Sequence, residues 1–440
     1  MLAWIACLVA WAGPYDDGVQ ALREGRFIEA KAKLEQAVAA SDRTEDAWWE
    51  LGWAHWTLEE YDGSVRAWEQ VRTLNPNREE LDHWLAAAQT RVALGKGAPK
   101  LVAVDEAPSP GTGLTVAAVG DTMMGSDLRR GPSGLPADDG QSIFAPVRDA
   151  LRGADVTFVN LEGPLADGLP SKKCRPDSTA CYAFRTPTRF TAGLLDAGVD
   201  VASLANNHAM DLGTAGQEST MAALDAAGIA HAGRYGDVGT VKHGELSIAF
   251  VAAHSGSCCL NVNRIAEVQQ AIVQADRDHD LVVFSFHGGA EGNGARHVPG
   301  KTEIAWGERR GDVRALSRAA VDAGADLVLG HGPHVLRAME VYRGRLIAYS
   351  LGNFVGYKQF GRGEYTGTSA ILHAELAPNG AVRSVRLEPL VLDERSAPQP
   401  DPAGRAIEQV NALSAQDFPD SGLALDADGR WSHTGTAAPQ

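Results

Sequence analysis

Short apolar segments recur along residues 114–394, and several are continuous runs rather than alternating patterns. Strands buried on both faces carry such runs, because helices cover both sides of a parallel sheet. Helical segments such as RFTAGLLDAG and GQESTMAALDAAG lie between some of the runs. The strands are expected in LTVAAVG, DVTFVN, VDVASLA, LSIAFVAA, DLVVFSF, ADLVLG, RLIAYSL, TSAILHAEL and VRSVRLEPLVL. The pattern therefore predicts a layered α/β domain whose last two strands are consecutive and antiparallel.

Polar side chains follow six of these strands at the point where each strand ends. They are Asp121, Asn160, Glu162, Asn206, Asn207, His208, His287, Glu291, His331, His334 and Asn353. Taken singly, each has an ordinary explanation, such as a helix N-cap or a turn. The carboxyl ends of strands in an open α/β sheet form the crevice where ligands bind, so six such ends favour one cluster. These oxygen and nitrogen donors suit Mn, Fe, Zn or Mg rather than a soft-metal thiolate site.

Residues 15–94 carry helical segments that repeat with a period of 34 residues, as between Gly18 and Gly52. The residues at tetratricopeptide positions are Trp48, Leu51, Gly52, Ser64, Trp68 and Pro76, after Gly18, Ala30, Leu34 and Ala37 in the earlier repeat. Leu85 and Ala86 begin a predicted capping helix. The pattern predicts a small all-α tetratricopeptide-repeat domain of the kind that binds protein partners, and a generic helical hairpin is the alternative.

The two ends of the chain and one internal segment show no such periodicity. Residues 1–12 contain an apolar run followed by small residues, which predicts a signal peptide cleaved before Gly13 and export to the periplasm or cell envelope. A frayed helix start is the alternative. Residues 95–113 are rich in Gly and Pro and predict a linker. Residues 396–440 predict a helix from Arg405 to Ser414 and a disordered tail from Thr434.

Four cysteines remain after the predicted leader, in two loop-like segments. They are Cys174, Cys181, Cys258 and Cys259. In an exported protein an even number of cysteines favours two disulfides. Adjacent cysteines do not easily bond to each other, so pairing between the two segments is expected. A zinc knuckle is the weaker alternative, because the spacing of these cysteines is poor for ligands.

The charge of the chain limits its partners. There are 40 Lys and Arg against 56 Asp and Glu, a formal net charge of −16. Such a chain does not attract nucleic acid or anionic lipid through its overall field, so contact with a membrane is expected only through an uncleaved leader. An anionic substrate would need a local device such as a metal ion.

The polar residues at the strand ends lie in six motifs. These are GDTMMG (120–125), VNLEGPL (159–165), LANNHAMDLG (204–213), HGGAE (287–291), GHGPHV (330–335) and YSLGNF (349–354). In order and spacing, residues 114–395 resemble the CapA family of bacterial capsule, or poly-γ-glutamate, synthesis proteins. The resemblance implies a branch of the calcineurin-like metallophosphoesterase superfamily, with a four-layer α/β sandwich and a site for one or two divalent metal ions. Members are commonly exported or membrane-tethered.

The resemblance also implies roles for individual residues. The implied metal ligands are Asp121, Glu162, Asn207, His287 and His334, and His208 matches a histidine that stabilises or protonates a leaving oxygen. Asn206, Glu291, His331 and Asn353 are further candidates for additional ligands or supporting groups. The chain departs from the superfamily in three places. Met123 stands where the first motif has a histidine, Glu162 replaces a bridging aspartate, and His331 and His334 are three positions apart instead of two.

Three functions are consistent with these features. The first is a metal-dependent hydrolase of a phosphoester or an amide. The second is a non-catalytic component that uses metal to hold an anionic capsule polymer during its assembly or export, which the missing histidine favours. The third is a scaffold whose repeats recruit partners. The residues alone do not choose among them.

Overall fold

The computed structural model describes residues 13–23, 26–41, 43–58, 60–78, 81–96, 112–128, 131–174 and 181–432. The predicted leader, most of the predicted linker and the predicted tail from Thr434 lie outside these ranges. The chain forms two compact units, Met1–Ala98 and Pro99–Gln440. No helix among the described residues is long and apolar enough to cross a membrane.

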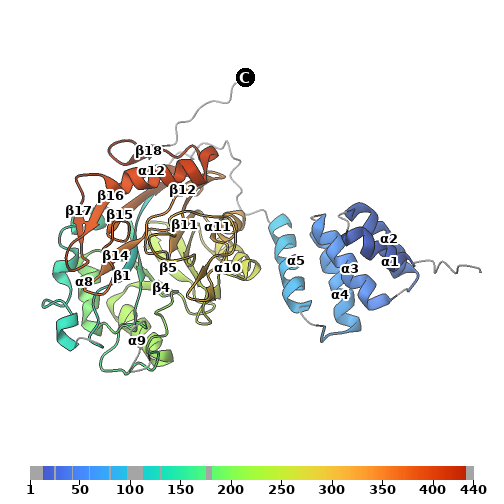
Figure 1. Ribbon diagram of the computed structural model, residues 1–440, viewed down its shortest axis with the longest axis horizontal. Coiled ribbons are helices and arrows are strands. Elements are labelled where there is room, and N and C mark those ends of the chain that lie inside the picture. The colour runs from blue at the N-terminus through green and yellow to red at the C-terminus, as the bar shows by residue number, and fades with distance from the viewer. Residues whose placement is uncertain are drawn as a thin grey trace, which may run out of the picture. The chain divides into compact units, whose positions relative to one another are not determined.

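The described residues of the N-terminal unit form five helices, each packed against the next (Figure 1). They are α1 (Pro14–Arg23), α2 (Phe27–Ala39), α3 (Thr44–Thr57), α4 (Tyr61–Leu74) and α5 (Leu81–Lys96). Helices α3 and α4 cross closely at Gly52, where a Cβ atom would lie 2.1 Å from Trp68 Nε1. Ser64 Oγ donates to the Gly52 carbonyl over 3.1 Å at the same crossing. A small residue is therefore required there, as the repeat pattern indicates.

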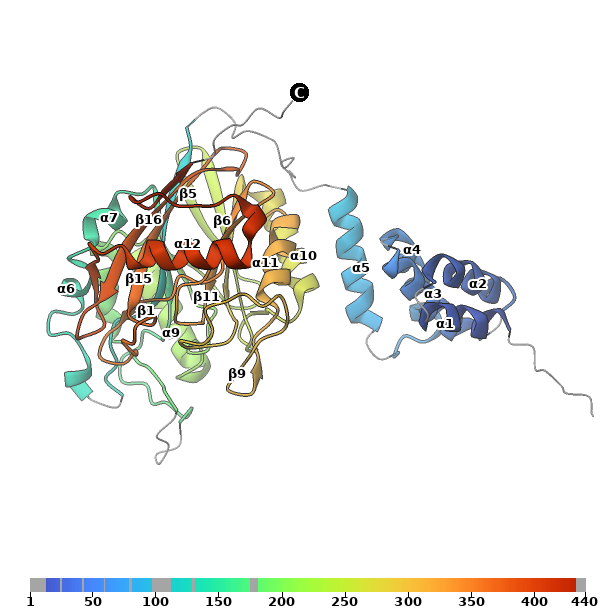
Figure 2. The same cartoon turned by 45° about the horizontal axis from the view of Figure 1, so that its top comes forward.

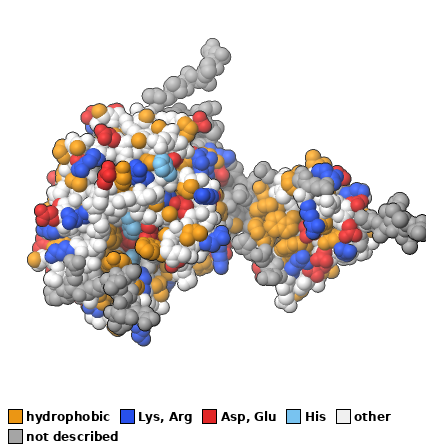
Figure 3. Space-filling model, in the orientation of Figure 1, with side chains coloured by type: hydrophobic (Ala, Val, Ile, Leu, Met, Phe, Trp, Pro, Cys, Tyr) orange, Lys and Arg blue, Asp and Glu red, His pale blue; other side chains and the backbone are white. Residues whose placement is uncertain are grey.

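Tryptophans fill the space between α3, α4 and α5. The Trp53 ring centroid lies 5.4 Å from that of Trp68 and 4.6 Å from that of Trp84. Hydrophobic side chains also gather on the face of this unit seen in Figure 3. The unit thus has the helical hairpins that the sequence predicts, while its assignment as a tetratricopeptide module stays a prediction.

The C-terminal unit is built on two large sheets. The first has the order β17-β16-β15-β1-β2-β3-β4, with β14 beside β1 and β18 beside β16. Its strands are β1 (Leu114–Met123), β2 (Val156–Leu161), β3 (Val201–Ser203), β4 (Ala230–Ala232), β14 (Asn353–Gly356), β15 (Thr368–Leu376), β16 (Val382–Leu392), β17 (Pro398–Pro400) and β18 (Arg430–Ser432). Strands β1 to β4 are parallel, and β15 and β16 are antiparallel as predicted.

The second sheet has the order β12-β13-β11-β8-β6-β5, with β7 beside β6. Its strands are β5 (Gly239–His243), β6 (Leu246–His254), β7 (Leu260–Asn261), β8 (Leu281–His287), β11 (Leu327–His331), β12 (Met339–Tyr342) and β13 (Arg345–Ala348). A separate hairpin pairs β9 (Ile304–Ala305) with β10 (Glu308–Arg309). Strands β6, β8, β11 and β13 are parallel at the centre of the sheet.

The two sheets pack face to face, with helices outside them. Side chains alternate along a strand, so Val116 and Ala118 of β1 join the core shared with the second sheet, while Ala117 and Val119 face a second cluster. The helices of that cluster are α6 (Gln141–Phe144), α7 (Arg148–Arg152), α8 (Thr191–Asp196) and α9 (Gly213–Ala227). Helices α10 (Ile265–Asp278) and α11 (Val313–Asp322) contact the second sheet. This helix–sheet–sheet–helix order confirms the predicted α/β sandwich.

The folded unit continues past residue 395, where the sequence suggested that it ends. Helix α12 (Arg405–Asp417) packs on β12, β15 and β16, as Figure 2 shows. Ile407 and Val410 of this helix belong to the core between the sheets. Burial of that apolar stripe makes the helix an integral part of the sandwich.

The expected disulfide pairing between the two cysteine segments is wrong. Cys174 bonds to Cys181, and the adjacent residues Cys258 and Cys259 bond to each other. Each bridge therefore closes a short local loop and does not join the two segments. The positions of the loops on the fold, rather than the spacing of the cysteines, decide this pairing.

Candidate metal centre

The registers of both sheets bring the predicted site residues to one edge of the sandwich. In the first sheet, Asp121 of β1 pairs with Asn353 of β14. In the second sheet, His287 of β8 pairs with His331 of β11 and with His254 of β6. These residues lie at or near the ends of their strands, where a parallel sheet presents side chains to a shared crevice. The structure thus places the strand ends of two facing sheets around one point.

A glycine permits the close contact between β1 and β14 beside Asp121. A Cβ atom on Gly120 would lie 2.1 Å from the carbonyl oxygen of Gly352. That oxygen accepts a hydrogen bond of 2.8 Å from the Asp121 amide. The Gly-Asp pair therefore sets the position of the Asp121 carboxylate.

Three side chains form the centre of the cluster. Asp121, Glu162 and His334 each offer a ligand atom, and these atoms lie within 4.8 Å of one another. His334 Nδ1 is 2.8 Å from Asp121 Oδ2, and His334 Nε2 is 3.8 Å from Glu162 Oε1. His334 has a φ of +59°, a costly left-handed conformation for a residue with a side chain. This strained turn between β11 and β12 places the His334 ring beside the carboxylates of Asp121 and Glu162.

Two further predicted ligands lie at this cluster. His287 Nε2 is 3.9 Å from Glu162 Oε1, and His287 Nδ1 is 3.8 Å from Asp121 Oδ1. Asn207 lies on the wall of the cavity in front of the cluster. Five buried atoms of these residues have no hydrogen-bond partner among the described residues: Asp121 Oδ2, Glu162 Oε1 and Oε2, Asn207 Oδ1 and His287 Nε2. Unpaired buried acceptors are costly, and oxygen and imidazole nitrogen are the donors that divalent cations accept, so this set fits a metal ion.

The pKa shifts of the residues in the cluster also fit a bound metal ion. Burial, and then the charge of Asp121, raises the pKa of Glu162 well above its usual range. Burial, with His254 nearby, lowers the pKa of His287 well below its usual range. Burial acts to lower the pKa of His334, but Glu162 and Asp121 outweigh it and raise that pKa to about 10. A divalent cation would let both carboxylates stay ionised together, which a buried site without a cation resists.

His208 lies beside the cluster and is held by a carboxylate behind it. His208 Nδ1 is 2.7 Å from Asp211 Oδ2, and His208 Nε2 is 3.9 Å from Glu162 Oε1. Asp211 also accepts from the Phe184 amide over 2.6 Å and from Lys173 Nζ over 2.5 Å. Burial lowers the pKa of His208, and the hydrogen bond to Asp211 opposes that shift. A neutral ring that donates from Nδ1 to Asp211 leaves Nε2 on the side of the cluster.

The four further candidates are engaged with other protein groups. Asn206 Nδ2 donates to Leu161 O over 2.9 Å, and Asn353 Oδ1 lies 3.0 Å from His334 Nδ1. His331 Nε2 lies 3.2 Å from the Val119 carbonyl. Glu291 accepts from Arg310 and from Trp306. These residues therefore lie around the cluster, and Asn206 and Asn353 position its members.

Met123, at the position where the family resemblance implies a departure from a ligand histidine, is buried with 1% of its surface exposed. Its sulfur accepts a hydrogen bond of 3.1 Å from the Gly125 amide. This side chain is thus engaged locally with the backbone.

Asn160, one of the predicted strand-end residues, donates from Nδ2 to Asp121 Oδ1 over 2.8 Å. Four other residues of the site, His254, Asp211, Lys173 and Arg310, were not predicted from the sequence. His254 ends β6 as the other histidines end their strands, and its Nδ1 lies 3.1 Å from the His287 carbonyl. His254 is therefore a polar residue at a strand end, and the criterion that selected the other candidates would also have selected this residue. The other three residues lie in loops, and a criterion based on strand ends cannot identify them. They are Asp211, Lys173 and Arg310.

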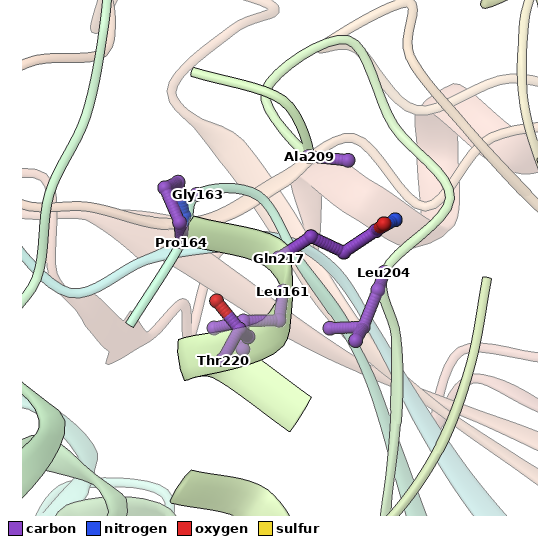
Figure 4. A pocket seen from close by; sticks show the side chains of 7 residues that line it. All are labelled: Leu161, Gly163, Pro164, Leu204, Ala209, Gln217 and Thr220. Atoms are coloured by element: carbon purple, nitrogen blue, oxygen red, sulfur yellow. The ribbon is translucent and has the colours of Figure 1, made fainter. Parts of the chain in front are cut away.

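A cavity of about 510 Å³ opens in front of the cluster. Its lining includes Asn207, His208, His334 and Asn353. A second cavity lies against the end of β2 and is lined by Leu161, Gly163, Pro164, Leu204, Ala209, Gln217 and Thr220 (Figure 4). Its volume is about 10 Å³, room for no more than a water molecule. The larger cavity is therefore the candidate substrate site.

These features define an α/β-sandwich protein with carboxylate, amide and histidine donors clustered at the strand ends. The family model described as bacterial capsule synthesis protein PGA_cap matches residues 115–358. That match covers more than half of the chain, and the chain belongs to this family.

Named relatives agree with this assignment. The capsule biosynthesis protein CapA of Bacillus anthracis is 29% identical over 316 residues, which cover 67% of this chain and 71% of the relative. The PGA biosynthesis protein CapA of Bacillus subtilis is 30% identical over 287 residues, which cover 61% of this chain and 70% of the relative. A probable polyglutamine synthesis accessory protein of Mycobacterium tuberculosis is 30% identical over 237 residues, 46% of this chain and 55% of the relative.

The solved structures that match the chain share little sequence with it and have low TM-scores. The 5'-nucleotidase precursor of Thermus thermophilus matches with 12% identity and a TM-score of 0.36, over 69% of this chain and 59% of that protein. GAP50, the anchor in the inner membrane complex of Plasmodium, matches with 11% identity and a TM-score of 0.31, over 69% of this chain and 95% of GAP50.

Proposed function

We propose that this capsule synthesis family member is a metal-dependent hydrolase that cleaves a phosphoester in the synthesis or export of an anionic capsule polymer such as poly-γ-glutamate. The observation that carries the proposal is the set of buried, unpartnered Glu162, Asn207 and His287 atoms beside Asp121 and His334.

The proposed ligands divide between the two sheets. Asp121 and Glu162 come from the first sheet, and His287 and His334 from the second, so one or two ions would join both halves of the sandwich. Asn207 would complete the set from the loop after β3. A divalent ion bound here supplies polarisation of a phosphoryl oxygen and a water of lowered pKa.

His208 is the proposed proton donor or acceptor at the leaving oxygen. Asp211 accepts the Nδ1 proton over 2.7 Å and so fixes the tautomer of the ring. The ring then exchanges one proton through Nε2, which lies on the side of the cluster and the cavity. A proton transfer of this kind typically contributes 10²–10⁴-fold in rate.

A second function is favoured by Met123, which takes the position of a metal-ligating histidine in the superfamily. With fewer ligands the centre would hold an anionic polymer without cleaving it. The N-terminal helices would in either case dock protein partners as tetratricopeptide repeats, and the predicted leader would direct the protein to the periplasm or cell envelope.

Metal analysis combined with an aryl-phosphate assay tests the proposal. The purified protein should carry a divalent metal, His287→Ala should lose most of it, and metal-loaded wild type should turn over the aryl phosphate. His243→Ala is the matched control, because that histidine is 40% exposed and contacts Asp155 away from the cluster. Metal binding without turnover would favour the polymer-holding function. Wild-type protein that binds no divalent metal would contradict both.

A further inference from the structure

The cavity in front of the cluster carries an exposed tryptophan and a buried arginine that the proposed hydrolysis does not use. We propose that this cavity binds a phosphoester with a ring in its leaving group, so that Trp306 stacks on the ring and Arg310 contacts an anionic oxygen. The proposal rests on the proposed function and names its substrate class.

Trp306 lies in a tight turn whose backbone conformation is unfavourable for a residue with a large side chain. It lies with Gly307 between β9 and β10, and the two residues have φ values of +52° and +80°. Positive φ at both central residues is the pattern of a type I′ turn, for which Asn-Gly is preferred and a bulky residue is strained. The Trp306 side chain is nevertheless 83% exposed, so its burial does not offset this cost. A bulky, exposed apolar side chain at such a strained position indicates a role in contact with a ligand.

The hairpin directs Trp306 to the cavity. Trp306 Nε1 donates to Glu291 Oε2 over 2.6 Å, and both residues line the cavity. At the base of the hairpin, Glu303 forms a buried ion pair of 2.7 Å with Arg337. The indole is thus anchored to a fixed support at the cavity mouth and does not lie on a freely moving loop.

Further aromatic side chains line the cavity. Phe184 stacks on His208 with ring centroids 4.2 Å apart, and Phe360 lies 5.3 Å from the ring of His334. Tyr182 also lines the cavity and is 50% exposed. Aromatic walls around polar groups suit a ligand with a flat or apolar face. A sugar or aryl ring has such a face, whereas the linear chain of a glutamate polymer does not.

Arg310 provides the polar contact in the same cavity. It is 2% exposed and donates from Nη2 to Glu291 Oε1 over 3.0 Å. Its Nη1 is buried and makes no hydrogen bond to any described residue. A buried guanidinium with an unused donor is costly, and an anionic oxygen of a ligand would satisfy it with a charge-assisted hydrogen bond.

Calorimetric binding of phosphonates, which are not hydrolysed, tests the proposal on the full-length metal-loaded protein. Phenylphosphonate should bind about tenfold more tightly than methylphosphonate because it adds a ring. Trp306→Asn should remove this difference and leave methylphosphonate binding unchanged. Because asparagine suits the turn, the variant should keep or raise the melting temperature, which separates loss of binding from loss of folding. Ile304→Ala is the matched control, since Ile304 is exposed on the same hairpin and does not line the cavity.

The outcomes distinguish this proposal from the proposed function. Equal binding of the two phosphonates by wild type, or a ring preference that survives Trp306→Asn, would overturn it even if the protein hydrolyses aryl phosphates. A ring preference lost in Trp306→Asn supports it even if no turnover is found. Cyclohexylphosphonate identifies the ring: binding as tight as phenylphosphonate indicates a sugar-like ring, and weaker binding indicates an aromatic one.

Discussion

The hydrogen bond between His208 and Asp211 allows a quantitative test of the proposed proton transfer. The two side chains are 2.7 Å apart, and Asp211 is 1% exposed, so solvent does not weaken the contact. Asp211→Asn replaces a charge-assisted hydrogen bond worth about 1.5–3 kcal/mol with a neutral one worth about 0.5–1.5 kcal/mol, a loss of about 1–1.5 kcal/mol. At 1.36 kcal/mol for each tenfold change in rate, kcat should fall by about 5- to 13-fold.

His208→Ala removes the transfer itself and should lower kcat by about 10²–10⁴-fold. Because Asp211 acts through the ring of His208, the double variant should be no slower than His208→Ala alone, and the two effects should be strongly non-additive. The assay is kcat on an aryl phosphate, with the ratio of metal to protein and the circular dichroism spectrum measured for each variant. Those two measurements are needed because Asp211 also accepts from the Phe184 amide and from Lys173.

The chain offers a matched control for this cycle. His231 and Asp225 form an exposed pair 3.2 Å apart, away from the cavity lining, so Asp225→Asn should leave kcat unchanged. The reasoning would be refuted if His208→Ala, with its metal retained, hydrolysed substrate as fast as wild type. An equal loss from Asp211→Asn in the presence and absence of His208 would show that Asp211 acts elsewhere.

Four further outcomes are expected. Glu303→Ala should lower the free energy of unfolding by about 3–5 kcal/mol in a denaturant titration, because it leaves the fully buried Arg337 without its counter-charge; an unchanged midpoint would contradict this. Gly52→Ala should destabilise the N-terminal helices by about 1–3 kcal/mol in thermal circular dichroism, since the added methyl group meets Trp68, and wild-type stability would count against the close crossing. Bound metal, measured after dialysis, should fall as the pH is lowered, because His334, whose pKa is raised to about 10 in the cluster, must lose its proton to bind; pH-independent retention would exclude histidine ligands. Exported protein should show no free thiol in intact-mass analysis after alkylation and should start near Gly13, whereas five alkylated cysteines, Cys7 included, and a retained Met1 would indicate a protein that is not exported.

Local patterns of the sequence were sufficient for the architecture of the sandwich. Apolar segments, several of them continuous, predicted nine of its strands, because a strand covered on both faces needs apolar side chains on both. Polar residues at strand ends predicted one cluster, because parallel strands end at a common edge. The short strands β4 (AHA), β12 (MEVY) and β14 (NFVG) were missed, because each contains a polar residue and lies in no long apolar run.

Tertiary structure decided the features that depend on which loops meet. The cysteines pair within their own loops, and helix α12 joins the core although it follows the expected end of the domain. Asp211 supports His208, and the β9–β10 hairpin places Trp306 beside Glu291, through contacts that no local period encodes. The burial of one face of a helix or strand appears in the sequence as a pattern of apolar residues. Contacts between distant loops depend instead on sheet register and turn geometry. The strands and the residues at their ends could therefore be predicted from the sequence, but the partners of those residues could not.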